Sequence, residues 1–194
     1  MRIIAGTLKG RRLRTPAWDG LRPTSDRLRE TLFDILADRI AGASVLDGYA
    51  GTGAVGIEAL SRGASAVVFV ERDRRAAALI GENLRHCGVS DGYDIIRADI
   101  GRVNRPDGSP PFDVIVLDPP YAETDLLACV TCTAPWLAAG GVLVLEHARR
   151  RASPPSAGHL ILTRVVPSGD SALSFYRHGR ADALTAGGSG TGAA

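Results

Sequence analysis

Short apolar runs alternate with amphipathic segments along most of the chain, beginning at residue 44. The apolar runs have the length of buried strands, and the amphipathic segments repeat apolar residues at helical spacing. Strands that alternate with helices form a parallel sheet with helices on both faces. The pattern predicts strands at 45–46, 66–70, 93–97, 112–117 and 142–146, and helices at 54–62, 74–86 and 126–138, the last of which Pro135 can divide.

The C-terminal part departs from this alternation. Residues 160–166 and 172–177, joined by a turn at 167–170, predict an antiparallel hairpin. Residues 101–111 are rich in glycine and proline and are expected as a loop. The expected fold class is therefore α/β, with a mostly parallel seven-stranded sheet that ends in an antiparallel hairpin.

An arm and a helix precede the alternation. Residues 2–5 and 13–16 are expected as two short strands, a small N-terminal β extension. Residues 26–40 carry apolar side chains at helical spacing, and Ser25 or Asp26 can cap that helix. Alanine, glycine, serine and threonine dominate the last residues and predict disorder. The expected parts are an arm at 1–24, one α/β domain at 25–180 and a tail at 181–194.

Positive charge is concentrated in the arm. The first 30 residues hold eight of the 23 arginine and lysine residues but three of the 21 acidic residues. A basic arm on a mildly acidic body predicts a polyanionic partner, although a solvated charged face has the same composition. A second basic run, 149–151, follows the fifth predicted strand, and its role is left open. The candidate phosphate-binding residues are Arg11, Arg12, Arg14 and Arg22.

The three cysteines do not form a metal site by their spacing. Cys129 and Cys132 make a C-x-x-C pair, and Cys87 is the remaining cysteine. A structural zinc site needs four ligands, so no metal is expected and the cysteines are interpreted as packed helix residues. Because no signal peptide or long apolar segment precedes Arg11, we expect a cytoplasmic protein without a membrane partner. A length of 194 residues fits one domain, and a monomer is expected.

The tetrapeptide Asp118-Pro119-Pro120-Tyr121 follows the apolar run 114–117, at the edge where open α/β sheets bind ligands. The carboxylate and a proline carbonyl can accept the two N–H groups of an amine on a planar base or amide. Proline fixes φ and thereby the direction of that carbonyl, and the tyrosine ring can stack on the base. The amine lone pair is then free to attack an electrophile in line. A proline-capped turn would also explain the tetrapeptide taken alone.

A glycine-rich turn follows the first predicted strand. Gly51 and Gly53 allow a ligand to approach the backbone closely, and with Gly56 they match the dinucleotide fingerprint. Asp47, at the end of the strand, argues against a dinucleotide, because its carboxylate would repel a pyrophosphate and attract the ammonium group of an amino acid. A dinucleotide fold also needs no arm and helix before this turn.

Two further carboxylates end the next two strands. Glu71 can accept both ribose hydroxyls. Asp99 can accept an N–H of an adenine amino group, with Ile100 against the ring. Each acid alone is more often a surface carboxylate, but Asp47, Glu71 and Asp99 end successive strands in the order that methionine, ribose and adenine require. The sequence therefore predicts S-adenosyl-L-methionine as the cofactor, whose sulfonium methyl is the electrophile.

Five segments together resemble the RsmD-type methyltransferases. The specific part is LRPTSDRLRETLF, since the glycine turn and the DPPY motif occur in many amino-methyltransferases. The resemblance covers about residues 2–146. The chain departs mildly from the family at Gly48 and Tyr49, where the family often has a larger residue and Tyr or Phe, and at Thr52, often Ser. The segments are residues 2–6, 10–13, 21–33, 47–63 (DGYAGTGAVGIEALSRG) and 118–121.

This resemblance implies a class I S-adenosylmethionine-dependent methyltransferase with a Rossmann-like fold. It implies methylation of N2 of one guanine in bacterial 16S rRNA, within the small ribosomal subunit or its assembly intermediate. It places the segment from Asp118 to Tyr121 at the target base. At the cofactor it places Asp47, Gly51, Gly53, Glu71 and Asp99. The neighbouring Gly48, Tyr49 and Ile100 are further candidate cofactor-binding residues.

Other functions fit the residues less well. Methylation of adenine N6 in DNA uses the same Asp-Pro-Pro-Tyr chemistry, but such enzymes need a large recognition domain to extrude a base. Only 20 residues separate Tyr121 from Val142, which leaves no room for one. Glutamine methyltransferases usually have Asn where Asp118 stands, and Asp47 disfavours an oxidoreductase. A non-catalytic RNA-binding module would leave the acids at three strand ends unexplained.

Overall fold

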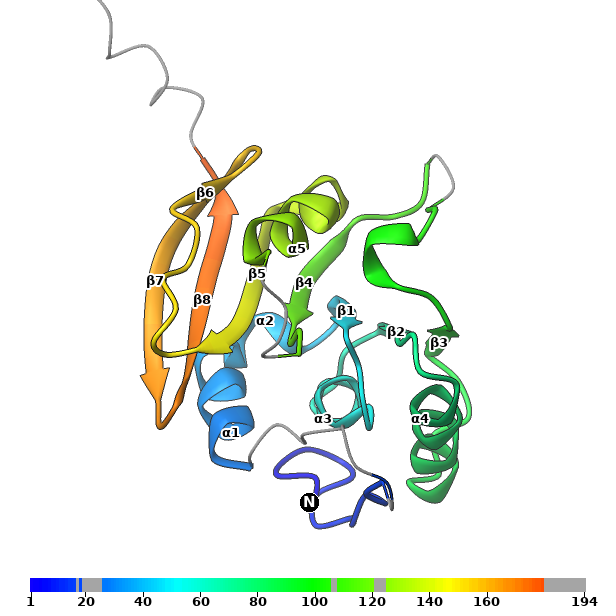
Figure 1. The fold of residues 1–194 in the computed structure, drawn as a ribbon. Helices are drawn as coiled ribbons and strands as arrows, with labels where there is room; N and C mark the ends of the chain where they lie inside the picture. The colour runs from blue at the N-terminus through cyan, green and yellow to red at the C-terminus, as the bar shows by residue number, and fades with distance from the viewer. Residues whose placement is uncertain (17, 19–25, 106–107, 121–124, 180–194) are drawn as a thin grey trace, which may run out of the picture.

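One mixed sheet carries the fold (Figure 1), in a computed structural model that describes residues 1–16, 18, 26–105, 108–120 and 125–179. Within these residues the sheet has eight strands in the order β3-β2-β1-β4-β5-β8-β7-β6. The first five of this order run parallel, and β8, β7 and β6 are antiparallel additions beyond β5. The strands are β1 (Ser44–Gly48), β2 (Ala66–Val70), β3 (Tyr93–Ile96), β4 (Phe112–Leu117), β5 (Leu137–Ala148), β6 (Ser156–Ala157), β7 (Leu160–Ser168) and β8 (Ser171–His178).

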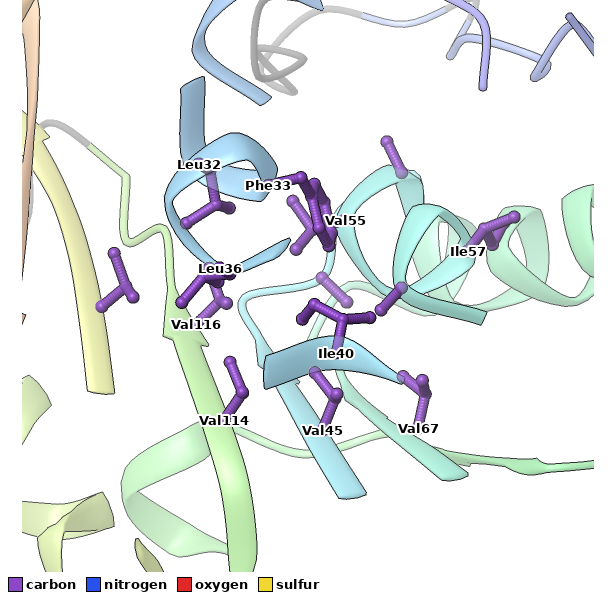
Figure 2. Close-up of a cluster of buried hydrophobic side chains, with 14 of the residues drawn as sticks. Leu32, Phe33, Leu36, Ile40, Val45, Val55, Ile57, Val67, Val114 and Val116 are labelled. Carbon is purple, nitrogen blue, oxygen red and sulfur yellow. The ribbon is translucent and has the colours of Figure 1, made fainter. Parts of the chain in front are cut away.

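Helices cover both faces of the sheet, because alternate residues of the central strands point to opposite sides and both sets are apolar. On one face, α1 (Asp26–Ile35), α2 (Ala37–Ile40), α3 (Ala54–Ser61) and α4 (Arg74–His86) pack on valines of the sheet. Figure 2 shows Leu32, Phe33 and Ile40 over Val45 and Val114 in this layer. On the other face lie α5 (Leu126–Thr133) and the 3-10 turns η1 (Ile100–Arg102) and η2 (Ala134–Trp136).

This architecture confirms the predicted α/β class, a mostly parallel sheet that ends in an antiparallel hairpin, with local differences. The predicted helix 26–40 is interrupted at Leu36, and α2 follows as a separate short turn. Pro135 divides the predicted helix 126–138, and β5 already begins at Leu137, which pairs with Phe112. The two-residue strand β6 brings the sheet to eight strands in the described residues, where seven were predicted.

The N-terminal arm is packed rather than extended. In place of the two predicted strands, the described part of the arm has an isolated antiparallel bridge that joins Arg2 to Arg12. The fully buried carboxylate of Glu58, on α3, accepts the backbone N–H groups of Ile4 at 2.8 Å and Ala5 at 2.9 Å. The next turn of α3 adds Ser61, whose hydroxyl accepts the N–H of Leu8. The arm is thereby fixed to the helix that follows the glycine turn.

Residues 19–24 of the arm and the tail 181–194 lie outside the described residues, so the expectations for them stay predictions. Among the residues described, no helix has the length and apolar character needed to cross a bilayer.

Two glycines of the arm test this docking. Gly6 and Gly10 both have positive φ, +81° and +83°, but a Cβ at Gly6 would lie 1.8 Å from the Ser61 carbonyl oxygen, whereas a Cβ at Gly10 would meet nothing within 4 Å. Gly10→Ala should therefore lower the free energy of unfolding only by the backbone cost of positive φ, about 1–2 kcal/mol. Gly6→Ala should lower the free energy of unfolding by at least ~1 kcal/mol more than Gly10→Ala does, because the arm must shift away from Ser61. Urea unfolding measures both, and equal losses would contradict the docked arm.

Candidate active site

The carboxyl ends of β1, β2 and β4 meet at the point where the strand order reverses. β2 and β3 extend the sheet to one side of β1, while β4 and β5 extend it to the other. Gly48, the last residue of β1, is opposite Val70 on β2 and Leu117 on β4. The residues that follow, Glu71 and Asp118, therefore leave the sheet on either side of the chain after Gly48. Open α/β sheets bind ligands at such a reversal.

The glycine turn connects β1 to α3 and is held by backbone bonds. The N–H of Ala50 donates to the carbonyl of Val70 at 3.0 Å, and the N–H of Gly53 donates to the carbonyl of Ala50 at 2.7 Å. Tyr49 has a φ of +66°, the one positive φ of a non-glycine among the described residues. Such a conformation costs free energy and is concentrated at functional sites. The Tyr49 hydroxyl lies 3.2 Å from Sγ of Cys129 on α5.

Two other glycines of this region are explained by packing. A Cβ at Gly56 would lie 2.2 Å from the Phe69 ring, so glycine lets α3 approach β2 closely. A Cβ at Gly48 would lie 2.7 Å from the Leu117 side chain. Because that packing alone accounts for Gly48, its predicted contact with a cofactor stays a prediction.

Asp47 is buried beneath the turn, with 2% of its surface exposed. Its Oδ2 accepts the backbone N–H of Gly56 at 2.8 Å, in the first turn of α3. Burial raises the pKa of this carboxyl well above its ordinary value, and the charges of Asp118 and Glu71 raise it further, while the Gly56 bond opposes them. Asp47 thus supports the turn, and its predicted role toward an ammonium group stays a prediction.

Glu71 joins the end of β2 to the glycine turn. Its Oε2 accepts the N–H of Gly51 at 2.8 Å, and its Oε1 accepts the N–H of Asp73, also at 2.8 Å. The side chain is half-buried. A carboxylate oxygen has more than one acceptor position, so each oxygen can still receive a hydroxyl. The geometry suits the predicted ribose contact.

Asp99 and Ile100 lie beyond the end of β3, on the far side of β2 from β1. Asp99 Oδ1 accepts the N–H of Gly101 at 3.1 Å, and Oδ2 lies 3.7 Å from the Arg72 guanidinium. Ile100 is buried, with 3% exposed, in the apolar cluster that contains Leu117. The carboxyl ends of β3, β2, β1 and β4 form a row along the sheet edge, and this pair lies at the β3 end of that row.

Asp118 stands at the other end of this row, one residue beyond β4. Its N–H donates to the Gly48 carbonyl at 3.3 Å, which continues the pairing of β4 with β1. The side chain is half-buried and close enough to Asp47 to raise the pKa of that group. Pro119 is buried and Pro120 is exposed. The structure thus brings Asp118 together with the glycine turn, while Tyr121 lies outside the described residues.

Two of the predicted RNA-binding arginines, Arg11 and Arg14, contact α4. Arg11 Nη1 donates to the His86 carbonyl at 3.5 Å, and Arg14 Nη1 lies 3.0 Å from the Glu82 carboxylate. Arg11, Arg12 and Arg14 are all exposed. Arg22 lies outside the described residues.

Sequence reasoning missed two features of this surface. The Arg75 guanidinium, at the start of α4, lies 4.8 Å from the centre of the Trp18 ring. Asn83 is fully buried and bonds both the arm and the glycine turn. A signal for Asn83 was present, because it occupies a position of the buried stripe of α4 that also contains Leu79, Ile80 and Leu84. A polar residue in an apolar stripe indicates a specific buried partner.

Cys87 and Cys129 are buried, as the prediction of packed cysteines requires, and Cys132 is half-buried. Cys129 and Cys132 lie on α5, and Cys87 caps α4. Burial, with a smaller contribution from Cys129, raises the pKa of Cys132 to about 11, so that thiol is protonated at neutral pH. The described residues include no group of three ligating side chains suited to a metal ion.

Comparisons with known proteins agree with this geometry. The sequence model of the family described as Conserved hypothetical protein 95 matches residues 1–177. The chain belongs to this family. Ribosomal RNA small subunit methyltransferase D of Haemophilus influenzae is 38% identical to it over 75% of this chain and 78% of its own length. The protein of that name from Escherichia coli is 32% identical over 91% of this chain and 89% of its own length.

A solved structure supports the same conclusion. The Escherichia coli protein yhhF superposes with a TM-score of 0.79 at 32% identity and covers 92% of this chain and 97% of its own. The protein is thus a methyltransferase of this family, with the class I fold.

The burial of Asp47 predicts a pH-dependent stability. Its pKa in the folded protein is raised, so the native state keeps this proton to higher pH than the unfolded chain. Stability therefore falls as pH rises above about 4, the ordinary range for Asp. Asp47→Asn retains an oxygen that can accept the Gly56 N–H but does not titrate. Urea unfolding from about pH 4 to 8 should show that the free energy of unfolding of the variant rises relative to that of the wild type as pH rises. If the two free energies change with pH in parallel, the prediction is wrong.

Proposed function

We propose that this protein transfers a methyl group from S-adenosyl-L-methionine to the exocyclic N2 amine of one guanine in 16S rRNA. One observation supports this most strongly: Asp118-Pro119-Pro120 lies at the same sheet edge as the glycine turn, beside the strand that ends in Asp47. The curated relatives are named for the RNA of the small ribosomal subunit. The substrate is that subunit or an intermediate in its assembly.

The residues at the strand ends fit the cofactor by their chemistry. Glu71 would accept the ribose hydroxyls, and Asp99 with Ile100 would hold the adenine. Asp47 is buried under the turn, where burial alone disfavours its ionised form. An ammonium group bound beside it would favour the carboxylate and be attracted by it. When bound, the cofactor supplies a methyl on a positively charged sulfur, which is already an electrophile. The protein therefore has to position an amine rather than provide its own nucleophile.

The Asp-Pro-Pro segment performs that positioning. An exocyclic amine is a weak nucleophile because its lone pair delocalises into the ring. When Asp118 and a proline carbonyl accept its two N–H groups, the amine is favoured in a pyramidal geometry whose lone pair points at the methyl. Holding two reacting atoms in line contributes roughly 7 kcal/mol or more to lowering a barrier. The Asp118 carboxylate can also accept the proton that the amine releases.

The arm and α4 provide the contacts with RNA. Arg11, Arg12 and Arg14 are exposed and can neutralise phosphates. The Arg75–Trp18 pair adds a planar surface on which an unpaired base can stack. Both features lie on the side of the molecule where the arm covers α3 and α4 (Figure 1).

The experiment that tests this function measures tritiated methyl transfer from the cofactor to three substrates. These are small ribosomal subunits from cells that lack the gene, naked 16S rRNA and duplex DNA. Label should enter one guanine of the 16S rRNA, identified by mapping the modified nucleotide. Label in adenine of the DNA would instead support the N6-adenine alternative and overturn the proposal.

Asp118→Ala should abolish turnover, with a loss of at least ~10³-fold in kcat, because the amine loses a charged acceptor at the reacting centre. The affinity for S-adenosylhomocysteine, measured by calorimetry, should stay nearly intact. Asp118→Asn is the matched control, since it keeps one acceptor oxygen and should retain more activity. A large loss of cofactor affinity in Asp118→Ala would count against the assigned role.

Replacing Arg11, Arg12 and Arg14 by Ala should weaken RNA binding in a salt-dependent manner. The slope of log affinity against log salt should decrease by roughly 0.7 for each phosphate of single-stranded RNA that the variant no longer neutralises. A triple Ala variant of Arg149, Arg150 and Arg151 removes the same charge elsewhere and serves as the control. Unchanged binding by the arm variant at every salt concentration would refute the arm's role. A changed slope in the control would assign RNA contact to the second basic run as well.

A further inference from the structure

Asn83 forms hydrogen bonds with both the arm and the glycine turn. It projects from α4 and is completely buried. Its Oδ1 accepts the backbone N–H of Arg14 at 2.8 Å, and its Nδ2 donates to the Arg14 carbonyl at 3.2 Å. The same Nδ2 donates to the carbonyl of Thr52 at 3.0 Å. One amide thus connects a segment of the arm to the residue between Gly51 and Gly53.

These bonds use main-chain groups on both sides. The Arg14 side chain is free to face outward, where its guanidinium meets the exposed Glu82 carboxylate. Thr52 is buried, with 4% exposed, and its carbonyl faces Asn83. The neighbouring N–H of Gly51 is held by Glu71. The turn is therefore fixed from two directions, by Glu71 at the sheet edge and by Asn83 on the side of the arm.

We propose that Asn83 is a positioning residue that couples the RNA-binding arm to the cofactor turn. The inference rests on the proposed function. Phosphates bound by Arg11 and Arg12 fix the arm backbone, and Asn83 transmits that position to Thr52. A ligand in the turn fixes Thr52, and the same amide transmits that order to Arg14. Asn83 touches neither ligand, so its effect is on their relative placement.

Coupling of this kind is reciprocal. If one ligand orders an element that the other must also order, each binds more tightly in the presence of the other, by the same factor. For the wild-type protein we expect S-adenosylhomocysteine to tighten 16S rRNA binding at least about five-fold, and the RNA to tighten S-adenosylhomocysteine binding equally. Both factors come from dissociation constants measured with and without the second ligand.

The test compares the full-length wild type with two Asn83 variants and one control. Asn83→Leu keeps a similar volume and removes all three bonds. Asn83→Asp keeps an acceptor for the Arg14 N–H but loses both donated bonds. The arm then keeps one of its two bonds to this side chain, while the turn loses its bond to it. Arg14→Ala is the control, because it removes the cation and keeps the backbone contacts with Asn83.

Both Asn83 variants should lose the coupling, with the factor falling to about one. In both, kcat should fall more than the affinity for either ligand alone. Arg14→Ala should weaken RNA binding but keep the coupling factor. Each protein is first checked for folding by thermal unfolding, and Asn83→Asp carries the test if Asn83→Leu does not fold. A wild-type coupling factor retained by a folded Asn83 variant would overturn the inference.

The two proposals fail in different ways. If the wild type neither binds nor methylates 16S rRNA, the proposed function is wrong. If it does both, but the two ligands bind independently in the wild type, the function stands and the role of Asn83 is wrong.

Discussion

The register of β1 between β2 and β4 is the constraint on which the rest of the site depends. Gly48 is opposite Val70 on one side and Leu117 on the other, so the three chains leave the sheet at the same level. Glu71 and Asp118 therefore flank the glycine turn because of the strand register, and no direct contact between them is needed. A shift of one residue in either pair would move a carboxylate to the opposite face of the sheet. The apolar residues that pack on both faces prevent such a shift, so the core positions the chemistry.

The site concentrates negative charge at a cost to stability. Asp47 is buried near the charges of Asp118 and Glu71, and its raised pKa records that unfavourable environment. Backbone N–H groups offset part of this cost, since Gly56 donates to Asp47 and Gly51 donates to Glu71. A positively charged cofactor would offset more. Negative potential at this sheet edge would favour the sulfonium and ammonium groups of the proposed cofactor.

Periodicity was sufficient to predict the layers of the fold and the strand ends that carry the acids. It succeeded because the parallel strands are short apolar runs and because α4 ends at the residues that its pattern indicates. It failed where tertiary contacts decide. The arm reads as two strands by composition, but the buried carboxylate of Glu58 takes the N–H groups that a strand partner would have used. The partners of Asn83 are separated from it by 31 and 69 positions, and no local pattern names them.

The hydrogen bonds that attach the arm to α3 affect how the surface of the arm can evolve. Both oxygens of Glu58 receive main-chain N–H groups, which every amino acid except proline provides. These bonds therefore require Glu58 on α3, but they do not require particular side chains at positions 4 and 5. Over generations, the outward side chains between positions 4 and 14 can therefore change while the attachment of the arm to α3 is kept.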